Sequence, residues 1–232
     1  MGNLVIAGLT PHPAIMIPEI GKKEADKVLN SRKAMKQLAE EVKKVNPDLL
    51  LIVTPHGPVF QDAIAINFQS RLKGDLGMFG AGQIRVSVPN DLEFCSELAR
   101  QAEKLGVETV LLDQRKANLY GVNLNLDHGA LVPLYFLQEI IEKVPLVHVT
   151  MGLLSREKLY AFGLAIQQTT FNLDKKLALI ISGELSHRLS EDGPYSYHPR
   201  GKEFDQWITG LIKDNDLIRI MDTDPDLCEQ AG

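Results

Sequence analysis

The sequence predicts an α/β protein with a central, mostly parallel sheet that is flanked by helices on both faces. Short runs rich in Leu, Val and Ile are bounded by Pro or Gly, which is the pattern of strands buried on both faces. Segments with an apolar face at helical spacing separate these runs. The first two strands, residues 4–9 and 49–53, are each followed by the same three residues, Thr-Pro-His, at positions 10–12 and 54–56.

The individual elements follow from the same patterns. Apolar or alternating runs predict strands at residues 4–9, 49–53, 61–69, 83–88, 107–112, 146–150 and 176–181. Helical periodicity, capping residues and stop signals predict helices over residues 22–45, 91–105, 130–143, 155–170 and 203–212, a helical turn at 215–220 and a further helix from 226.

Two stretches are predicted to be loops. Residues 70–82 contain four glycines, which favours either a flap over a site or a plain surface loop. Residues 113–129 form the second loop, with His128 near its end.

Composition limits the classes of protein that the chain can represent. A length of 232 residues, 44% hydrophobic and 24% charged, suits one large domain over 1–232. The net charge of -5 gives no support for nucleic-acid binding, and no apolar stretch approaches the ~20 residues of a membrane span. Cys95 and Cys228 form no spacing motif, and the N-terminus lacks a secretory pattern. We therefore expect a cytoplasmic protein.

The repeated Thr-Pro-His phrase predicts a site. Because the carboxyl ends of parallel strands meet at one edge of a sheet, His12 and His56 are expected to converge on one point as metal ligands or catalytic groups. The strand at 176–181 delivers a third histidine, His187, in the phrase Ser-Gly-Glu-Leu-Ser-His. His148 lies inside an apolar strand and is predicted to be a core residue, and His198 to be a surface turn residue.

The residues alone leave the metal and its chemistry open. Two histidines and one carboxylate on one face of iron(II) leave positions for substrate and oxygen. Candidate carboxylates are Glu184, Asp62 and Glu229, and the sequence does not choose among them. On this basis a zinc hydrolase is nearly as plausible as an iron oxygenase.

Four short motifs occur in an order that resembles a known family. They are Thr-Pro-His-Pro at residues 10–13, the second histidine turn, Leu-Asp-His-Gly at 126–129 followed by Val-Pro-Leu at 132–134, and the phrase at 182–187. The set resembles the class III extradiol ring-cleaving dioxygenases, the superfamily of the protocatechuate 4,5-dioxygenase catalytic subunit. Residues 71–75 and 193–205 resemble the branch found with radical-SAM and AMMECR1-like proteins and related to the Memo proteins.

The resemblance implies roles for four histidines. His12 and His56 match the ligands of a non-haem iron(II), His187 matches the acid–base histidine, and His128 matches a histidine that lines the substrate pocket. The implied substrates are a small catecholic or related aromatic and molecular oxygen. Zinc or copper are the other metals considered, and a homodimer is expected.

The resemblance also implies a third ligand, a glutamate expected just beyond Gly232. Either the domain over 1–232 lacks its C-terminal end, or the third ligand is lost or replaced, and weak metal binding is expected in both cases. The alternative function is that of a non-enzymatic or redox-modulating metal-binding protein of the Memo type, which works through partners. A metal-dependent hydrolase is the weaker third alternative.

Overall fold

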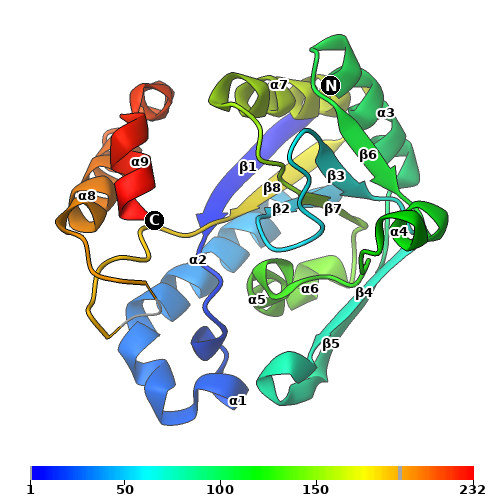
Figure 1. Ribbon diagram of the computed structural model, residues 1–232. Helices are drawn as coiled ribbons and strands as arrows, with labels where there is room; N and C mark the ends of the chain where they lie inside the picture. Colours follow the sequence, from blue (N-terminus) through cyan, green and yellow to red (C-terminus); the bar gives the residue numbers. More distant parts are fainter. Residues whose placement is uncertain (1, 193–194) are drawn as a thin grey trace. The chain divides into compact units, whose positions relative to one another are not determined.

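A six-stranded sheet forms the centre of the larger of two units in this computed structural model, which describes residues 2–192 and 195–232 (Figure 1). The units comprise residues 1–183 and 184–232. The strand order is β1 (Asn3–Thr10), β8 (Lys176–Ser182), β2 (Leu49–Thr54), β7 (Leu146–Thr150), β3 (Ile64–Asn67) and β6 (Thr109–Leu112).

The sheet is mostly parallel, as predicted. β1, β8, β2 and β7 pair in parallel with one another, whereas β3 pairs antiparallel with β7 and parallel with β6. The carboxyl ends of the first four strands therefore lie at one edge. The predicted fold class is confirmed.

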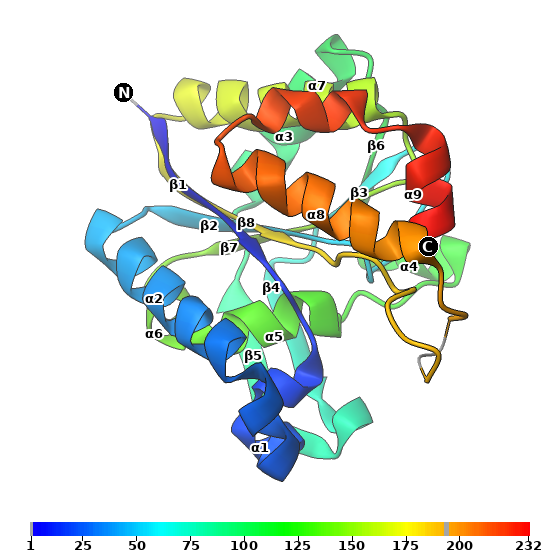
Figure 2. The same cartoon turned by 90° about the vertical axis from the view of Figure 1, so that its left-hand side faces the viewer.

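Helices cover both faces of this sheet. Two long helices, α3 (Leu92–Lys104) and α7 (Arg156–Asn172), lie on one face (Figure 2). The other face carries α2 (Leu29–Val45), α5 (His128–Phe136), α6 (Gln138–Ile141) and a hairpin of β4 (Arg71–Leu76) and β5 (Ala81–Pro89). The remaining elements of this unit are η1 (Ala14–Met16), α1 (Pro18–Gly21), η2 (Lys22–Val28), η3 (Gly77–Phe79) and α4 (Gln114–Tyr120).

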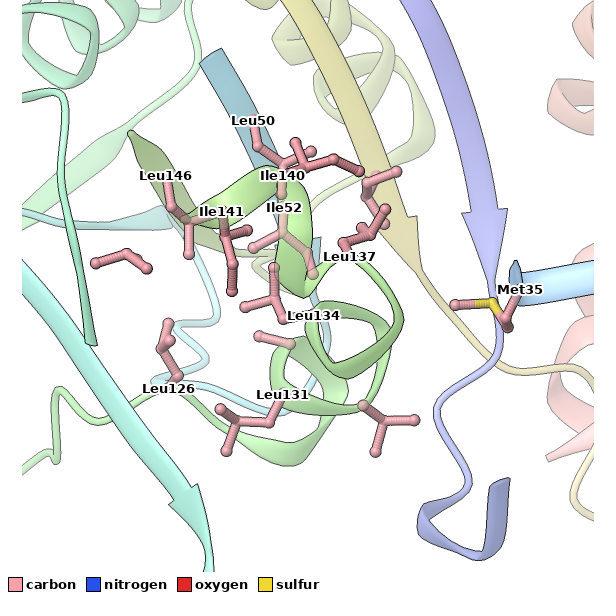
Figure 3. Packing of buried hydrophobic residues seen from close by; sticks show 14 of the residues in the cluster. Met35, Leu50, Ile52, Leu126, Leu131, Leu134, Leu137, Ile140, Ile141 and Leu146 are labelled. Carbon is pink, nitrogen blue, oxygen red and sulfur yellow. The ribbon is translucent and has the colours of Figure 1, made fainter. Parts of the chain in front are cut away.

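The alternation of side chains along β2 divides the core in two. Leu50 and Ile52 point toward α5 and α6 and lie beside Ile140 and Ile141 of α6 (Figure 3). Leu49 and Leu51 point to the opposite face, into the cluster beneath α3 and α7. A strand buried on both faces in this way explains why its sequence is continuously apolar.

The smaller unit is helical over most of its described length. It contains α8 (Pro199–Lys213), η4 (Leu217–Asp222) and α9 (Pro225–Ala231). These elements match the helices predicted at 203–212 and from 226 and the turn at 215–220. The resemblance drawn from residues 193–205 begins at residues 193–194, which lie outside the described residues.

The predicted loop at 70–82 is wrong. β4 and η3 occupy most of it, and β4 pairs with β5 in an antiparallel hairpin. Glycine is required at position 74 of β4, because a Cβ there would be 2.7 Å from the carbonyl oxygen of Leu126. The backbone N–H of Leu126 donates to the carbonyl of Lys73 at 2.7 Å, so the two segments approach more closely than a larger side chain permits.

Two further boundaries differ from the prediction. The predicted loop at 113–129 contains α4, whose first turn is capped by the Asp113 carboxylate accepting from the N–H of Lys116. The predicted helix at 130–143 is two helices, because α5 begins at His128 and ends before Leu137, and α6 follows. Among the helices of the described residues, none combines the length and the apolar composition that a membrane-spanning helix needs.

We expect the two cysteines to differ sharply in reactivity. Cys95 is fully buried, and burial, followed by the charge of Asp91, raises the pKa of its thiol to about 12. Since the thiolate is the reactive form, Cys95 should not react with a disulfide reagent at pH 8 in the folded protein. Titration should show one accessible thiol at most, and two after unfolding in guanidinium. A Cys228→Ser variant that still shows a fast thiol would contradict this expectation.

Candidate metal centre

Two histidines meet at the carboxyl ends of β1 and β2. His12 and His56 each lie two residues past the end of their strand, and β8 runs between the two strands. Their Nε2 atoms are 2.8 Å apart, and their ring centroids are 4.7 Å apart. The predicted convergence of these two rings within about 4 Å is therefore confirmed as geometry, and their role as metal ligands stays a prediction.

A third histidine joins this pair. His128 is the first residue of α5, and its ring stacks on that of His56 with centroids 4.3 Å apart and planes inclined by 29°. One ring nitrogen from each of His12, His56 and His128 lies within 4.8 Å of the others. Three imidazoles suit a divalent transition metal such as iron, copper or zinc better than calcium or magnesium.

The carboxylate that was expected to complete the set is not found in this group. In the part of the chain that the structure describes, Asp62 does not belong to the group of histidines. Glu184 and Glu229 belong to the smaller unit. The third ligand thus stays a prediction.

Burial and a hydroxyl group fix the orientation of His12. Its side chain is buried, and its Nδ1 hydrogen-bonds the Oγ of Ser182, the last residue of β8, at 2.8 Å. One ring nitrogen is therefore held by the protein while the other faces His56. This is the arrangement in which proteins commonly orient a ligating histidine. His56 is exposed at the surface of the unit.

A partly buried carboxylate, that of Asp127, connects the other two histidines. The Thr54 hydroxyl donates to Asp127 Oδ1 at 2.7 Å and accepts the backbone N–H of His56 at 3.2 Å. The same Oδ1 caps α5 by accepting the N–H of Ala130 at 3.2 Å. Because His128 is the first residue of that helix, Asp127 helps to fix both His56 and His128.

His148 completes this network. Its Nε2 lies 3.1 Å from Asp127 Oδ2 and must donate, because an ionised carboxylate only accepts. Burial raises the pKa of Asp127, but the hydrogen bond and charge of His148, with the bonds from Thr54 and Ala130, together lower it to about 2. The carboxylate is therefore ionised at neutral pH, with both oxygens occupied. The prediction that His148 is a buried, satisfied residue is confirmed.

Close packing brings α5 against the end of β2. A Cβ at position 129 would lie 2.3 Å from Thr54 Oγ1 and 3.2 Å from His56 Cδ2, so Gly129 is required there. On its other side His128 contacts Phe79 of η3, with ring centroids 5.7 Å apart. The glycine-rich hairpin turn, predicted as a possible flap, thus supplies an aromatic neighbour of the cluster.

The remaining candidate histidines lie in the smaller unit. His187 Nε2 hydrogen-bonds Glu184 Oε2, and its ring stacks on Tyr195 with centroids 5.0 Å apart. A carboxylate partner and an aromatic neighbour are compatible with an oriented acid–base group, and this role stays a prediction. His198 caps α8, where its Nδ1 accepts the N–H of Arg200 at 3.3 Å.

Sequence reasoning missed the roles of Asp127, Thr54 and Ser182. Asp127 was visible as the residue before His128 in Leu-Asp-His-Gly, and Thr54 as the first residue of the repeated phrase. Their partnership was not visible, because the contact joins segments far apart in the chain.

The chain is similar to a known protein family, to a curated protein and to a solved structure. The family model described as "Catalytic LigB subunit of aromatic ring-opening dioxygenase" matches residues 6–232. The chain is 34% identical over 224 residues to Protein CA_C1420 of Clostridium acetobutylicum, which covers 97% of this chain and 48% of the relative. The chain thus spans about half the length of this curated relative. Among solved structures, the uncharacterized protein JW3007 from Escherichia coli K12 is similar over 77% of this chain and 64% of its own, with a TM-score of 0.45 and 16% identity.

The structure makes a prediction about Asp127. Replacing it by alanine removes a helix cap and leaves the Thr54 hydroxyl and His148 Nε2 buried without their acceptor. The expected loss in the free energy of unfolding is roughly 2–4 kcal/mol. Asp113→Ala is the matched control, since Asp113 caps α4 through the N–H of Lys116, and should cost about 1 kcal/mol. Urea unfolding gives both values, and equal losses would show that Asp127 acts only as a cap.

The stabilisation by Asp127 should also depend on pH. Its pKa is about 2 in the folded protein, below the value of about 3.9 in unfolded chains. The ionised form therefore stabilises the fold fully above about pH 4, and this contribution is lost as the pH falls toward 2. The difference in stability between the natural protein and Asp127→Asn should shrink over that range.

Proposed function

Because the chain belongs to the family of the catalytic LigB subunit of aromatic ring-opening dioxygenases, we propose that it is an extradiol-type dioxygenase. Its substrates would be molecular oxygen and a small catecholic or related aromatic, and its metal would be iron(II). The observation that carries the proposal is the approach of His12 Nε2 to His56 Nε2 at 2.8 Å beside His128.

Each histidine has a distinct part in this proposal. His12 and His56 hold the metal, with His12 oriented by Ser182 and the His56 loop held by Thr54. When bound there, iron(II) supplies the point at which the aromatic diol and oxygen are brought together. A carboxylate from elsewhere in the protein completes the ligand set, since both oxygens of Asp127 are already engaged.

In the proposed dioxygenase, His128 faces the substrate. It is half-buried, lies on the α5 side of the metal pair and has Phe79 as its aromatic neighbour. A ring at this position can hydrogen-bond a substrate oxygen while Phe79 excludes water. His187, held by Glu184, is the group that takes a proton from the catechol and later returns it.

We also propose a branch of the family, a cellular location and an oligomeric state for the protein. Residues 71–75 favour the Memo-related branch associated with AMMECR1-like proteins. A chain with only two cysteines, Cys95 and Cys228, which form no spacing motif, favours a cytoplasmic location, and a homodimer is the expected assembly.

Metal content and oxygen uptake test these assignments together. With iron(II) in excess, as the expected weak binding requires, the anaerobic protein should bind the metal and should consume oxygen when catechol and oxygen are added. His12→Ala and His56→Ala should lose both properties, because each removes a ligand. His128→Gln should keep the metal and lose turnover, and His198→Asn, which preserves a helix cap in the smaller unit, should behave like the natural protein.

Two outcomes would count against this reading. If His128→Gln also loses the metal, the site is a three-histidine centre and His128 is a ligand. If the natural protein retains metal but consumes no oxygen with any catechol, a non-enzymatic metal-binding protein of the Memo type replaces the dioxygenase.

His187 separates a proton-transfer role from a ligand role. His187→Gln should leave the metal content intact and lower the rate of oxygen uptake by on the order of 10²- to 10⁴-fold, the usual loss for an acid–base group. Tyr195→Leu, which removes only the stacked ring, is the matched control and should cost far less. Loss of metal in His187→Gln would make it a ligand, and unchanged turnover would make it structural.

A further inference from the structure

A groove along β5 lies apart from the histidine cluster and has the chemistry of a binding site. It consists of two cavities in the larger unit, of about 580 Å³ and about 190 Å³. Both are lined by Ile84, Arg85, Tyr135 and Gln138, so they adjoin, and we call them together the β5 groove. Its size falls in the range of small-molecule sites, roughly 300–1,000 Å³.

The larger end of the β5 groove is cationic. Arg32 and Lys36 of α2 and Arg85 of β5 line it, and Glu19 is its one acidic residue. The Tyr135 hydroxyl donates to Glu19 at 3.1 Å, so this carboxylate already has a partner. Two excess positive charges therefore face one cavity in a chain whose net charge is -5.

These cations have no acidic partners of their own. Among the residues that the structure describes, Arg32, Lys36 and Arg85 make no ion pair, and Arg85 reaches only the carbonyl of Gly82 at 3.2 Å. The Nε of Arg32 is buried without any hydrogen-bond partner. A buried and unpaired guanidinium N–H is costly, and an anion in the cavity would satisfy it.

The smaller end is lined mostly by apolar side chains, although Ser87, Gln138 and Glu142 also border it. Ile84 and Val86 of β5 face Leu131 and Leu134 of α5 and Ile141 of α6 across it. Its volume of about 190 Å³ is close to the roughly 150 Å³ of cavities that hold one benzene ring. The groove is thus amphipathic along its length.

We propose that the β5 groove binds a small organic anion, with its carboxylate or phosphate at Arg32, Lys36 and Arg85 and its apolar body between β5 and α5. None of the residues that line the groove belongs to the histidine cluster. The ligand would nevertheless touch α5, which begins with His128, and the hairpin that carries Phe79. The inference does not depend on the proposed dioxygenase activity.

Calorimetric titration of the metal-free full chain tests this site. The probes are benzoate and phenyl phosphate, with acetate and inorganic phosphate as partners that lack the apolar body. An aromatic anion should bind with one-to-one stoichiometry and at least about tenfold more tightly than its small partner. The stronger of benzoate and phenyl phosphate identifies the head group as a carboxylate or a phosphate.

Variants locate the binding. Arg32→Gln and Arg85→Gln should each weaken it by roughly tenfold or more, the loss expected for one charge-assisted hydrogen bond. Arg115→Gln, a matched change at an exposed arginine of α4 outside the groove, should have no effect. His56→Ala should also leave the affinity unchanged, which separates this site from the metal centre.

Three results would overturn the proposal. The first is that neither aromatic anion binds at concentrations up to about 10 mM, a dissociation constant that calorimetry still detects. The second is equal affinity for an aromatic anion and its small partner. The third is binding that survives Arg32→Gln and Arg85→Gln or that is abolished by His56→Ala.

Discussion

The hydrogen bond from Thr54 to Asp127 is the contact on which the candidate site depends. It joins the end of a buried strand to the first turn of α5, two segments that are distant in the sequence. On the strand side, Thr54 also holds the backbone of His56. On the helix side, Asp127 caps the helix that begins with His128. The partly buried carboxylate of Asp127 therefore sets the positions of two histidines, and the absence of a side chain at Gly129 permits the approach.

The same contact limits the chemistry that Asp127 can perform. Its two oxygens are used by Thr54, Ala130 and His148, so it supplies a negative charge near the cluster without offering a free ligand oxygen. A fixed negative charge of this kind favours a cation bound among the imidazoles. In the described part of the larger unit, the ring nitrogens of His12, His56 and His128 are the atoms that could hold a metal ion. A site with two histidines and one carboxylate thus needs a carboxylate other than Asp127.

The fold class and the meeting of His12 with His56 were predictable because both follow from local pattern and one topological rule. Continuous apolar runs indicate parallel strands, and parallel strands present their carboxyl ends together. The glycine-rich segment misled the prediction, since glycine count is a local signal whereas Gly74 is required by the backbone of Leu126. The partner of His148 was equally hidden, because alternation predicts burial but not which distant carboxylate satisfies a buried ring.

The strand order explains why the site forms at this edge of the sheet. The four parallel strands β1, β8, β2 and β7 all end in a hydroxyl residue, and each of these side chains is buried: Thr10, Ser182, Thr54 and Thr150. The strand register pairs Thr10 with Ser182 and Thr54 with Thr150. Because β8 lies between β1 and β2, Ser182 ends between the two histidine turns and can hold His12. Hydroxyl groups both donate and accept, so they can anchor backbone and imidazole groups without adding charge. A neutral, buried row of this kind orients the histidines and leaves their remaining nitrogens directed toward one point.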